Sequence, residues 1–203
     1  MSVAGLRFGP IGRRAVHVAI DMQRMFAQDS EWSTPATLAI APCVARIAAH
    51  APERTVFTRF LAPKAAHEAL GQWQVYYRRW SSIVATHRDP GMFDLLPMLQ
   101  AFVPPARVVD KFTYSAYEAR GFQLALDGLG ADTMILTGVE TDVCVLATAM
   151  TAVDRGLRTI LVSDALASSS AEGHAAAMTA VYPHFDQQIE VIESVTLLKE
   201  WKP

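Results

Sequence analysis

The sequence predicts an α/β protein, a three-layer α/β/α sandwich around a mainly parallel sheet of six strands. Short apolar runs alternate along the chain with segments of helical periodicity, which is the order expected of a parallel α/β fold. The runs 134–136 and 160–162 are continuously apolar, as expected when helices cover both faces of a sheet. With 203 residues, 51% of them hydrophobic, the chain has an ordinary size for a single domain, which we expect to span 1–203.

The first half of the chain contains three predicted strands and one long helix. An apolar run at 16–21 ends in Asp21 and is the first strand. Thr34 and Pro35 are typical of a helix start, and the helix is expected to continue to about His50. The second and third predicted strands are 55–59 and 108–111.

The second half of the chain continues this alternation of helices and strands. Gly156 is expected to end one helix, because glycine is favoured just after a helix C-terminus. In chain order, the predicted elements are a helix at 117–129, a strand at 133–139, a helix at 142–155, a strand at 159–163, a helix at 171–182 and a strand at 189–192.

Three side chains with useful chemistry stand at the ends of predicted strands or just beyond them. Asp21 ends the first strand, Lys111 ends the third, and Cys144 follows the fourth. In a doubly wound sheet, functional side chains gather at the carboxyl ends of the strands. We therefore expect a base, a cation and a nucleophile to meet at one edge of the sheet.

Cys144 lies where a strand gives way to a helix after Gly138. A sulfur in the first turn of a helix faces unpaired N–H groups and the positive end of the helix dipole. The sequence therefore predicts that thiolate is favoured over thiol. The same N–H groups can hold a developing oxyanion.

The sequence lacks the motifs of several other functions that occur on α/β folds. The turn at 21–26 contains no glycine, which excludes a dinucleotide-binding loop, and the sequence contains no Gly-Lys-Ser/Thr P-loop. A phosphatase with an aspartyl nucleophile would need a second carboxylate two residues after Asp21, where this chain has Gln23. Cofactor binding and phosphatase activity are both disfavoured.

Charge and cysteine content also exclude functional classes. The net charge of −2 is dispersed, so we expect no nucleic acid and no membrane as partners. Cys43 is the other cysteine, without a CxxC motif, so the sequence supports neither a disulfide framework nor a structural zinc. Residues 1–14 lack the apolar core of a signal peptide, and we expect a cytoplasmic protein.

Three motifs resemble those of the isochorismatase-like cysteine hydrolases. They are Asp21-Met22-Gln23 with Phe26, Lys111 with Ser115-Ala116, and Gly138-Val139-Glu140-Thr141-Asp142-Val143-Cys144-Val145. Phe57-Thr58-Arg59 and Ser163-Asp164-Ala165, followed by Glu172 and His174, are similar to further landmarks of the family. The family includes nicotinamidases, N-carbamoylsarcosine amidohydrolases, ureidoacrylate amidohydrolases and vinyl-ether-cleaving isochorismatases, and its sheet is Rossmann-like.

The resemblance implies a mechanism without a cofactor. Asp21, Lys111 and Cys144 would form the catalytic triad, and the thiol would attack a carbonyl carbon to give a thioester. The backbone N–H groups of Glu140 and Cys144 would form the oxyanion hole. A cis peptide bond would join Val139 to Glu140.

Two departures from the family narrow the expected activity. Nicotinamidases carry an Asp-x-His metal site just after the second strand, where this chain reads Arg59-Phe60-Leu61-Ala62-Pro63. A nicotinamidase is therefore disfavoured, and we predict no catalytic metal. The vinyl-ether-cleaving members lack the thiol, so Cys144 favours the amidohydrolase branch.

An inserted segment at 62–92 is rich in aromatic residues and arginine. Trp73, Tyr76, Tyr77 and Trp80 are spaced to share one helix face. This face is either a packing surface, within the chain or between subunits, or a lid in which Arg78 or Arg79 binds a carboxylate. The candidate substrate-binding residues are Phe26, Arg59, Phe60, Trp73, Tyr77, Arg78, Phe112 and Tyr117.

The sequence leaves two functional classes open. The first is a metal-independent cysteine hydrolase that cleaves a C–N bond of a small amide, ureido or imide substrate. The alternative is a family member that hydrolyses another small molecule, or one that binds a ligand or partner without catalysis. If the aromatic face lies between subunits, the protein is a homodimer or homotetramer.

Overall fold

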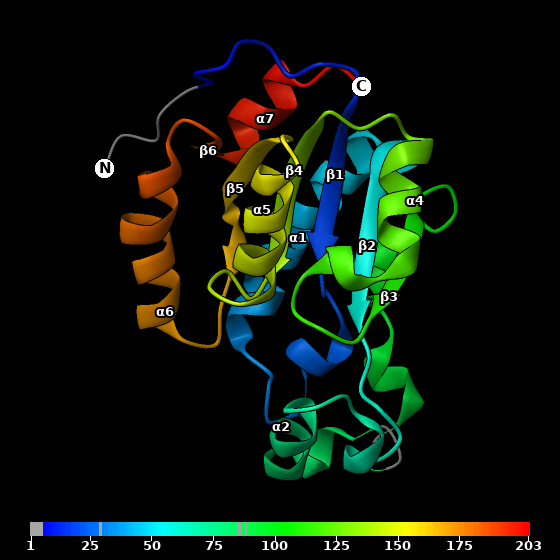
Figure 1. The fold of residues 1–203 in the computed structure, drawn as a ribbon. Coiled ribbons are helices and arrows are strands. Elements are labelled where there is room, and N and C mark those ends of the chain that lie inside the picture. Colours follow the sequence, from blue (N-terminus) through cyan, green and yellow to red (C-terminus); the bar gives the residue numbers. More distant parts are fainter. Residues whose placement is uncertain (1–5, 29, 85–86, 88) are drawn as a thin grey trace.

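The computed structural model describes residues 6–28, 30–84, 87 and 89–203, and these residues form one parallel sheet with helices on both faces (Figure 1). The strand order is β3-β2-β1-β4-β5-β6, and every pairing of neighbours is parallel. The predicted fold class is confirmed. The strands are β1 (Ala15–Ile20), β2 (Thr55–Phe60), β3 (Arg107–Lys111), β4 (Thr133–Val139), β5 (Arg158–Ala167) and β6 (Ile189–Ile192).

Each face of the sheet has its own helices and its own apolar core. α1 (Pro35–His50) and α7 (Ser194–Glu200) cover one face, and α4 (Arg120–Gly128) and α5 (Cys144–Asp154) cover the other (Figure 1). α6 (Ala171–Ala176) continues on the α5 side through a π-helical segment and a 3-10 turn, Ala177–Val181 and Tyr182–Phe185. Because both faces are covered, the central strands are buried along their whole length.

Most predicted elements agree with the structure, and the larger differences are these. β5 extends to Ala167, past the predicted end at 163, because it pairs with β4 again after a register shift between Leu136 and Gly138. The predicted helix at 117–129 is divided, since Ala119 is extended between a 3-10 turn, Ala116–Glu118, and α4. Neither α7 nor the short helix Pro97–Gln100 was predicted, and α5 begins at Cys144, two residues after its predicted start.

Helix α1 begins where the sequence indicated. Thr34 is extended, and its side-chain oxygen accepts the N–H of Ala36 at 3.3 Å, which stabilises the first turn. Pro35 occupies the first helical position, where its missing N–H costs no hydrogen bond.

Gly138 permits the close approach of β4 to β1. Its φ of +104° lies in the region that favours glycine, and a Cβ at this position would lie 2.1 Å from the carbonyl oxygen of Ile20. No other residue fits here. β1 and β4 are also the strands between which the chain reverses its direction across the sheet, so their carboxyl ends form the topological switch point.

The segment between β2 and β3 lies beyond the carboxyl ends of the strands (Figure 1). It contains α2 (Trp73–Arg79) and α3 (Pro97–Gln100), joined by 3-10 turns. The predicted insertion at 62–92 belongs to this segment, apart from residues 85, 86 and 88, which lie outside the described residues. In the part of the chain that the structure describes, no helix is long and apolar enough to cross a membrane.

Candidate active site

Asp21, Lys111 and Cys144 come together at the switch point. Asp21 directly follows β1, Lys111 ends β3, and Cys144 is the first residue of α5. The Lys111 ammonium lies 2.7 Å from Asp21 Oδ2, and both side chains are fully buried. The Cys144 sulfur is near enough to both charged groups that each of them shifts its pKa.

The Asp21 carboxylate is held by the neighbouring strand. Its backbone has a φ of +51°, which is uncommon for a residue other than glycine. Thr58 of β2 donates its hydroxyl to Asp21 Oδ1 at 2.6 Å and accepts the Asp21 N–H at 3.1 Å. These two bonds fix the orientation of the carboxylate and stabilise the unusual backbone.

Lys111 is held as a cation. Its Nζ donates to the carbonyl of Thr113 at 3.0 Å and lies 4.8 Å from the centroid of the Phe60 ring. Burial, the largest single effect, lowers the pKa of Lys111, but the Asp21 carboxylate and the Cys144 sulfur together outweigh it, and the pKa lies above its usual range. Lys111 is therefore positively charged.

The Cys144 thiol differs from the expectation based on sequence. Burial raises the pKa of Cys144; Lys111 opposes this rise, whereas the Asp21 carboxylate adds to it. The sulfur is therefore protonated in the resting site, although it lies in the first turn of α5. The direction is opposite to the expectation that thiolate is favoured, because burial is the largest effect on the pKa of Cys144 and raises it.

Two backbone N–H groups beside the thiol are without acceptors. Among the described residues, neither the N–H of Glu140 nor that of Cys144 donates a hydrogen bond. The carbonyl of Glu140 instead accepts the N–H groups of Val143 and Val145, each at 3.1 Å. The Val139–Glu140 peptide bond is cis. The geometry thus offers two donors next to the sulfur.

The loop that carries these donors is tied to the helices beyond it. The Thr141 hydroxyl lies 2.9 Å from His174 Nδ1, and the Tyr182 hydroxyl donates to the Thr141 carbonyl at 2.6 Å. Ser168 donates to Asp142 Oδ1 at 2.5 Å. The sequence pointed to His174 only through the family resemblance, and it gave no sign of the role of Tyr182.

A cavity of about 290 Å³ opens above the thiol. Its walls are mainly aromatic, with two carboxylates and no Lys, Arg or His among the described lining residues. The lining consists of Phe26, Glu31, Trp32, Phe60, Tyr76, Trp80, Tyr114, Glu140, Val143, Cys144 and Ser169.

Four of the candidate substrate-binding residues lie in or directly behind this wall. Phe26 and Phe60 line the cavity. Trp73 and Tyr77 lie behind it, where Trp73 packs against Phe60 and Tyr114 with ring centroids 6.3 and 4.7 Å apart. Tyr77 is buried beneath Trp73.

The other four candidates lie elsewhere. Arg78 is exposed on the outer side of α2, and Phe112 is 56% exposed. Tyr117 packs in the core on the α5 side, against Phe122 and beneath Arg155. None of these three side chains lines the cavity.

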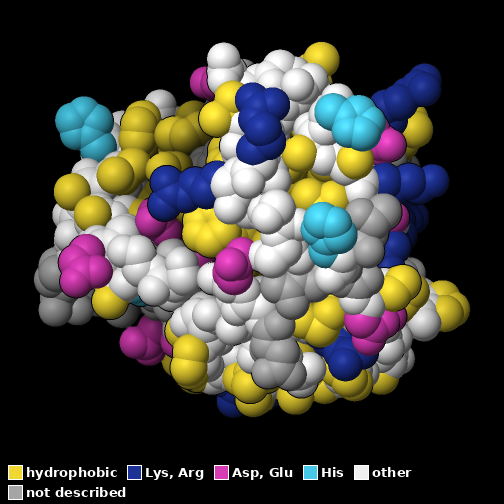
Figure 2. All heavy atoms as spheres, turned by 90° about the horizontal axis from the view of Figure 1, so that it is seen from below, with side chains coloured by type: hydrophobic (Ala, Val, Ile, Leu, Met, Phe, Trp, Pro, Cys, Tyr) yellow, Lys and Arg dark blue, Asp and Glu magenta, His cyan; other side chains and the backbone are white. Residues whose placement is uncertain are grey.

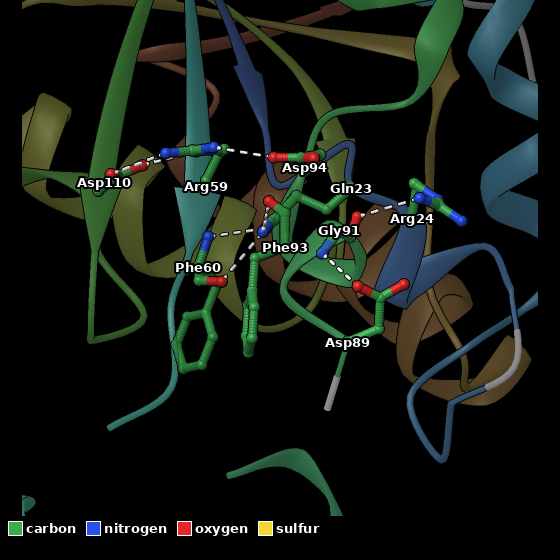
Figure 3. A network of polar contacts seen from close by, with 9 residues as sticks. All are labelled: Gln23, Arg24, Arg59, Phe60, Asp89, Gly91, Phe93, Asp94 and Asp110. Carbon is green, nitrogen blue, oxygen red and sulfur yellow. Dashed lines mark hydrogen bonds and ion pairs between the residues drawn. The ribbon is translucent and has the colours of Figure 1, made fainter. Parts of the chain in front are cut away.

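Arg59, the fourth, points to the opposite side of β2 from Phe60, because side chains alternate along a strand (Figure 3). Its guanidinium makes two bonds of 2.7 and 2.9 Å to the carboxylate of Asp110, the residue directly opposite it on β3. Asp94 is a second partner, 3.4 Å from the guanidinium. With these acceptors, Arg59 joins β2 and β3 and has no access to the cavity.

Gln23 fixes the backbone from which Phe60 enters the cavity (Figure 3). Its side-chain oxygen accepts the N–H of Phe60 at 2.7 Å, and its side-chain nitrogen donates to the carbonyls of Phe60 and Phe93 at 3.0 and 2.8 Å. The fully buried amide thus joins the end of β2 to the segment before α3.

Most of the aromatic residues that line the cavity were not predicted from the sequence as binding residues. Tyr76 and Trp80 belong to the predicted helix face but were not proposed as binding residues. Trp32 and Tyr114 lie in loops, where no periodicity marks them. The shared α2 face packs within the chain, against Trp32, Phe60 and Tyr114, so it needs no second subunit to cover it. The oligomeric state stays a prediction.

The position of the family's metal ligands carries other side chains. Arg59 pairs with Asp110, and Phe60 lines the cavity. In residues 6–203 apart from 29, 85, 86 and 88, no three His, Cys, Asp or Glu side chains form a group able to hold a metal ion.

Comparisons with known sequences find one family. The Isochorismatase domain matches residues 15–193. An uncharacterised isochorismatase family protein of Bacillus subtilis (strain 168) is 36% identical over 97 residues, which are 47% of this chain and 51% of that protein. Nicotinamidase 3 of Arabidopsis thaliana is 35% identical over 74 residues, 36% of this chain and 37% of that protein. The matched stretches thus span about half or less of these curated relatives.

A solved structure shares the whole fold. A cysteine hydrolase from Pseudomonas syringae pv. phaseolicola 1448A superposes with a TM-score of 0.82 and 23% identity over 98% of both chains. At this identity the likeness shows the fold alone.

Proposed function

Since the chain belongs to the isochorismatase family, we propose that it is a metal-independent cysteine hydrolase that cleaves a C–N bond of a small amide, ureido or imide substrate. One observation carries the proposal. A thiol, a carboxylate and an ammonium group meet in a buried cluster at the base of an aromatic cavity.

The nucleophile would be activated at the moment of attack. The resting sulfur is protonated, because burial raises the pKa of Cys144. As the sulfur bonds to the substrate carbonyl carbon, its proton passes to the Asp21 carboxylate. The Lys111 ammonium remains charged throughout and offsets the negative charge, which moves from Asp21 to the substrate oxygen.

The tetrahedral oxyanion would be held by the N–H groups of Glu140 and Cys144. Support for this role comes from their lack of acceptors among the described residues. Donors that are already oriented stabilise a developing charge without further reorganisation. Removal of one such donor in other hydrolases costs on the order of 10²–10³-fold in rate.

The C–N bond would break as Asp21 returns its proton to the departing nitrogen, which leaves as ammonia or an amine, or as a carboxamide when the substrate is an imide. The acyl group stays on Cys144 as a thioester. Asp21 then takes a proton from water, whose oxygen attacks the thioester carbon, and the carboxylic acid leaves as the thiol is restored. No step in this sequence needs a cofactor.

A hydrolysis screen tests the proposal, with ammonia release as the readout for small amides and ureides and formation of the ring-opened half-amide as the readout for cyclic imides. We expect turnover of at least one class by the wild-type protein and none by the Cys144→Ala variant. Intact-protein mass spectrometry after rapid acid quench should show the acyl adduct on the wild type alone. Turnover that the Cys144→Ala variant retains would contradict the proposal.

A further inference from the structure

We propose that the aromatic cavity binds a positively charged part of the substrate, an ammonium or alkylated ammonium group, next to the amide that is cleaved. This inference rests on the proposed function, because it places the cleaved bond at Cys144. It goes further by naming the substrate class that the cavity walls select.

Trp32 forms the centre of the aromatic wall. Its ring centroid lies 6.0 Å from that of Phe26 and 5.7 Å from that of Phe60. Tyr76 and Trp80 lie at 5.9 and 6.2 Å. Together with Tyr114, these rings give the cavity six aromatic side chains. Grouped aromatic faces attract cations, and the attraction grows where water is excluded.

The charged groups of the lining are both acidic. Glu140 is held at the wall because its Oε1 accepts the N–H of Ser169 at 3.0 Å. Glu31 accepts a hydrogen bond from the Ser82 hydroxyl. Figure 2 views this end of the molecule, where acidic side chains lie among apolar ones and basic ones also reach the surface. No basic side chain lines the cavity among the described residues.

Two basic groups that contact residues of the cavity wall already have partners. Lys111 is paired with Asp21, so with a neutral thiol the reacting groups carry no net charge. Arg79 is exposed and lies 5.4 Å from the centroid of the Trp80 ring, which leaves Trp32, Tyr76 and Tyr114 for a ligand. Among the described residues, the cavity lining therefore presents two carboxylates and no basic side chain to offset them. These carboxylates repel an anionic substrate, and a cationic substrate gains more electrostatic binding free energy from them than a neutral substrate does.

Matched ligands that differ only in charge test this inference. Trimethylglycinamide carries a trimethylammonium group beside its amide, and 3,3-dimethylbutanamide has the same shape with carbon in place of the charged nitrogen. We would titrate both into the Cys144→Ala protein by calorimetry, so that chemical reactivity does not contribute. A longer pair, 4-(trimethylammonio)butanamide and 5,5-dimethylhexanamide, places the same groups further from the thiol.

In at least one pair, we expect the cation to bind on the order of tenfold more tightly than its neutral isostere. Glu140→Gln and Trp32→Leu, each made in the Cys144→Ala protein, should reduce this preference. Glu53→Gln in the same background is the control, because it removes an equal charge from the 3-10 turn before β2, at the opposite edge of the sheet. This variant should leave the preference for the cation unchanged. Equal binding within both pairs, or a preference that survives Glu140→Gln and Trp32→Leu, would overturn the inference.

The two proposals fail in distinguishable ways. Binding of the cation to the Cys144→Ala protein does not require catalysis, and ammonia release by the wild type does not require a cationic substrate. Tight cation binding without any turnover would contradict the hydrolase alone. Turnover of neutral amides without a preference for the cations would contradict the cation site alone.

Discussion

Lys111 Nζ and Asp21 Oδ2 form an ion pair of 2.7 Å in which both side chains are fully buried. Burying two charges costs several kcal/mol per ion, and a buried pair is often no more stabilising than apolar residues of the same size. Thr58 and the Thr113 carbonyl supply the remaining hydrogen bonds. The pair is therefore better explained by the chemistry of the site than by the stability of the fold.

Cys144→Ser should abolish turnover while the protein stays folded. The hydroxyl has nearly the volume of the thiol, but its far higher pKa prevents Asp21 from removing its proton during attack. We expect ammonia release to fall by roughly 10³-fold or more and the melting temperature to stay close to that of the wild type. Retained turnover would show that the thiol has only a structural role.

Lys111→Ala should remove turnover and destabilise the fold. The Asp21 carboxylate would be left buried without its partner, which costs about 3–5 kcal/mol. Chemical denaturation measures this loss, and the double variant with Asp21→Asn is the matched control because it removes the unpaired charge. We expect the double variant to regain part of the lost stability.

The same variant tests the electrostatics of the thiol. Lys111 is the group that lowers the pKa of Cys144 against burial and Asp21. Labelling by iodoacetamide should therefore become slower in Lys111→Ala. In the wild type, the labelling rate should continue to rise above neutral pH. An unchanged rate in the variant would assign Lys111 another role.

His17 should make the protein less stable in acid. It is fully buried between Thr55 and Thr137, and burial lowers its pKa to about 3. Below the unfolded pKa of about 6.5, the unfolded chain gains a proton that the folded chain does not accept. The free energy of unfolding should therefore fall by roughly 1.4 kcal/mol per pH unit between about pH 6 and pH 4. Denaturation across this range should show a shallower dependence for His17→Gln, and an identical slope would contradict the assignment.

Gly138→Ala should destabilise the protein far more than Gly156→Ala. Both glycines have positive φ, but a Cβ at Gly138 meets the Ile20 carbonyl, whereas at Gly156 nothing lies within 4 Å. Gly156→Ala should therefore cost only the backbone strain, about 1 kcal/mol. Gly138→Ala adds a clash with rigid backbone and should cost more than about 3 kcal/mol. Melting temperatures of the two variants measure the difference, and similar values would contradict the close approach of β1 and β4.

Dialysis against EDTA should change neither activity nor melting temperature. The resemblance implies that Arg59 and Phe60 stand where nicotinamidases carry metal ligands, and Arg59 is engaged by Asp110. A bound ion would stabilise the folded state by mass action, so its removal would lower the melting temperature. Loss of activity that zinc or iron restores would contradict a metal-independent mechanism.

The sequence by itself determined the fold and the meeting of three side chains. Short continuous apolar runs that alternate with helical segments favour strands covered on both faces, and this pattern leads to a parallel sheet. The carboxyl ends of such strands lie at one edge whatever the loops between them do. Asp21, Lys111 and Cys144 were therefore predictable as neighbours from their places at strand ends.

Only the tertiary structure decided the cavity wall and the state of the thiol. Trp32 and Tyr114 come from separate loops and meet at the cavity through packing that no local pattern encodes. Arg59 was excluded from the cavity by strand register, which sets Asp110 directly opposite it. The pKa of Cys144 depends on how completely distant segments bury it and on how close they bring Asp21 and Lys111. The pKa depends on burial and on neighbouring charges, and segments distant in the sequence supply both of these only after the chain has folded.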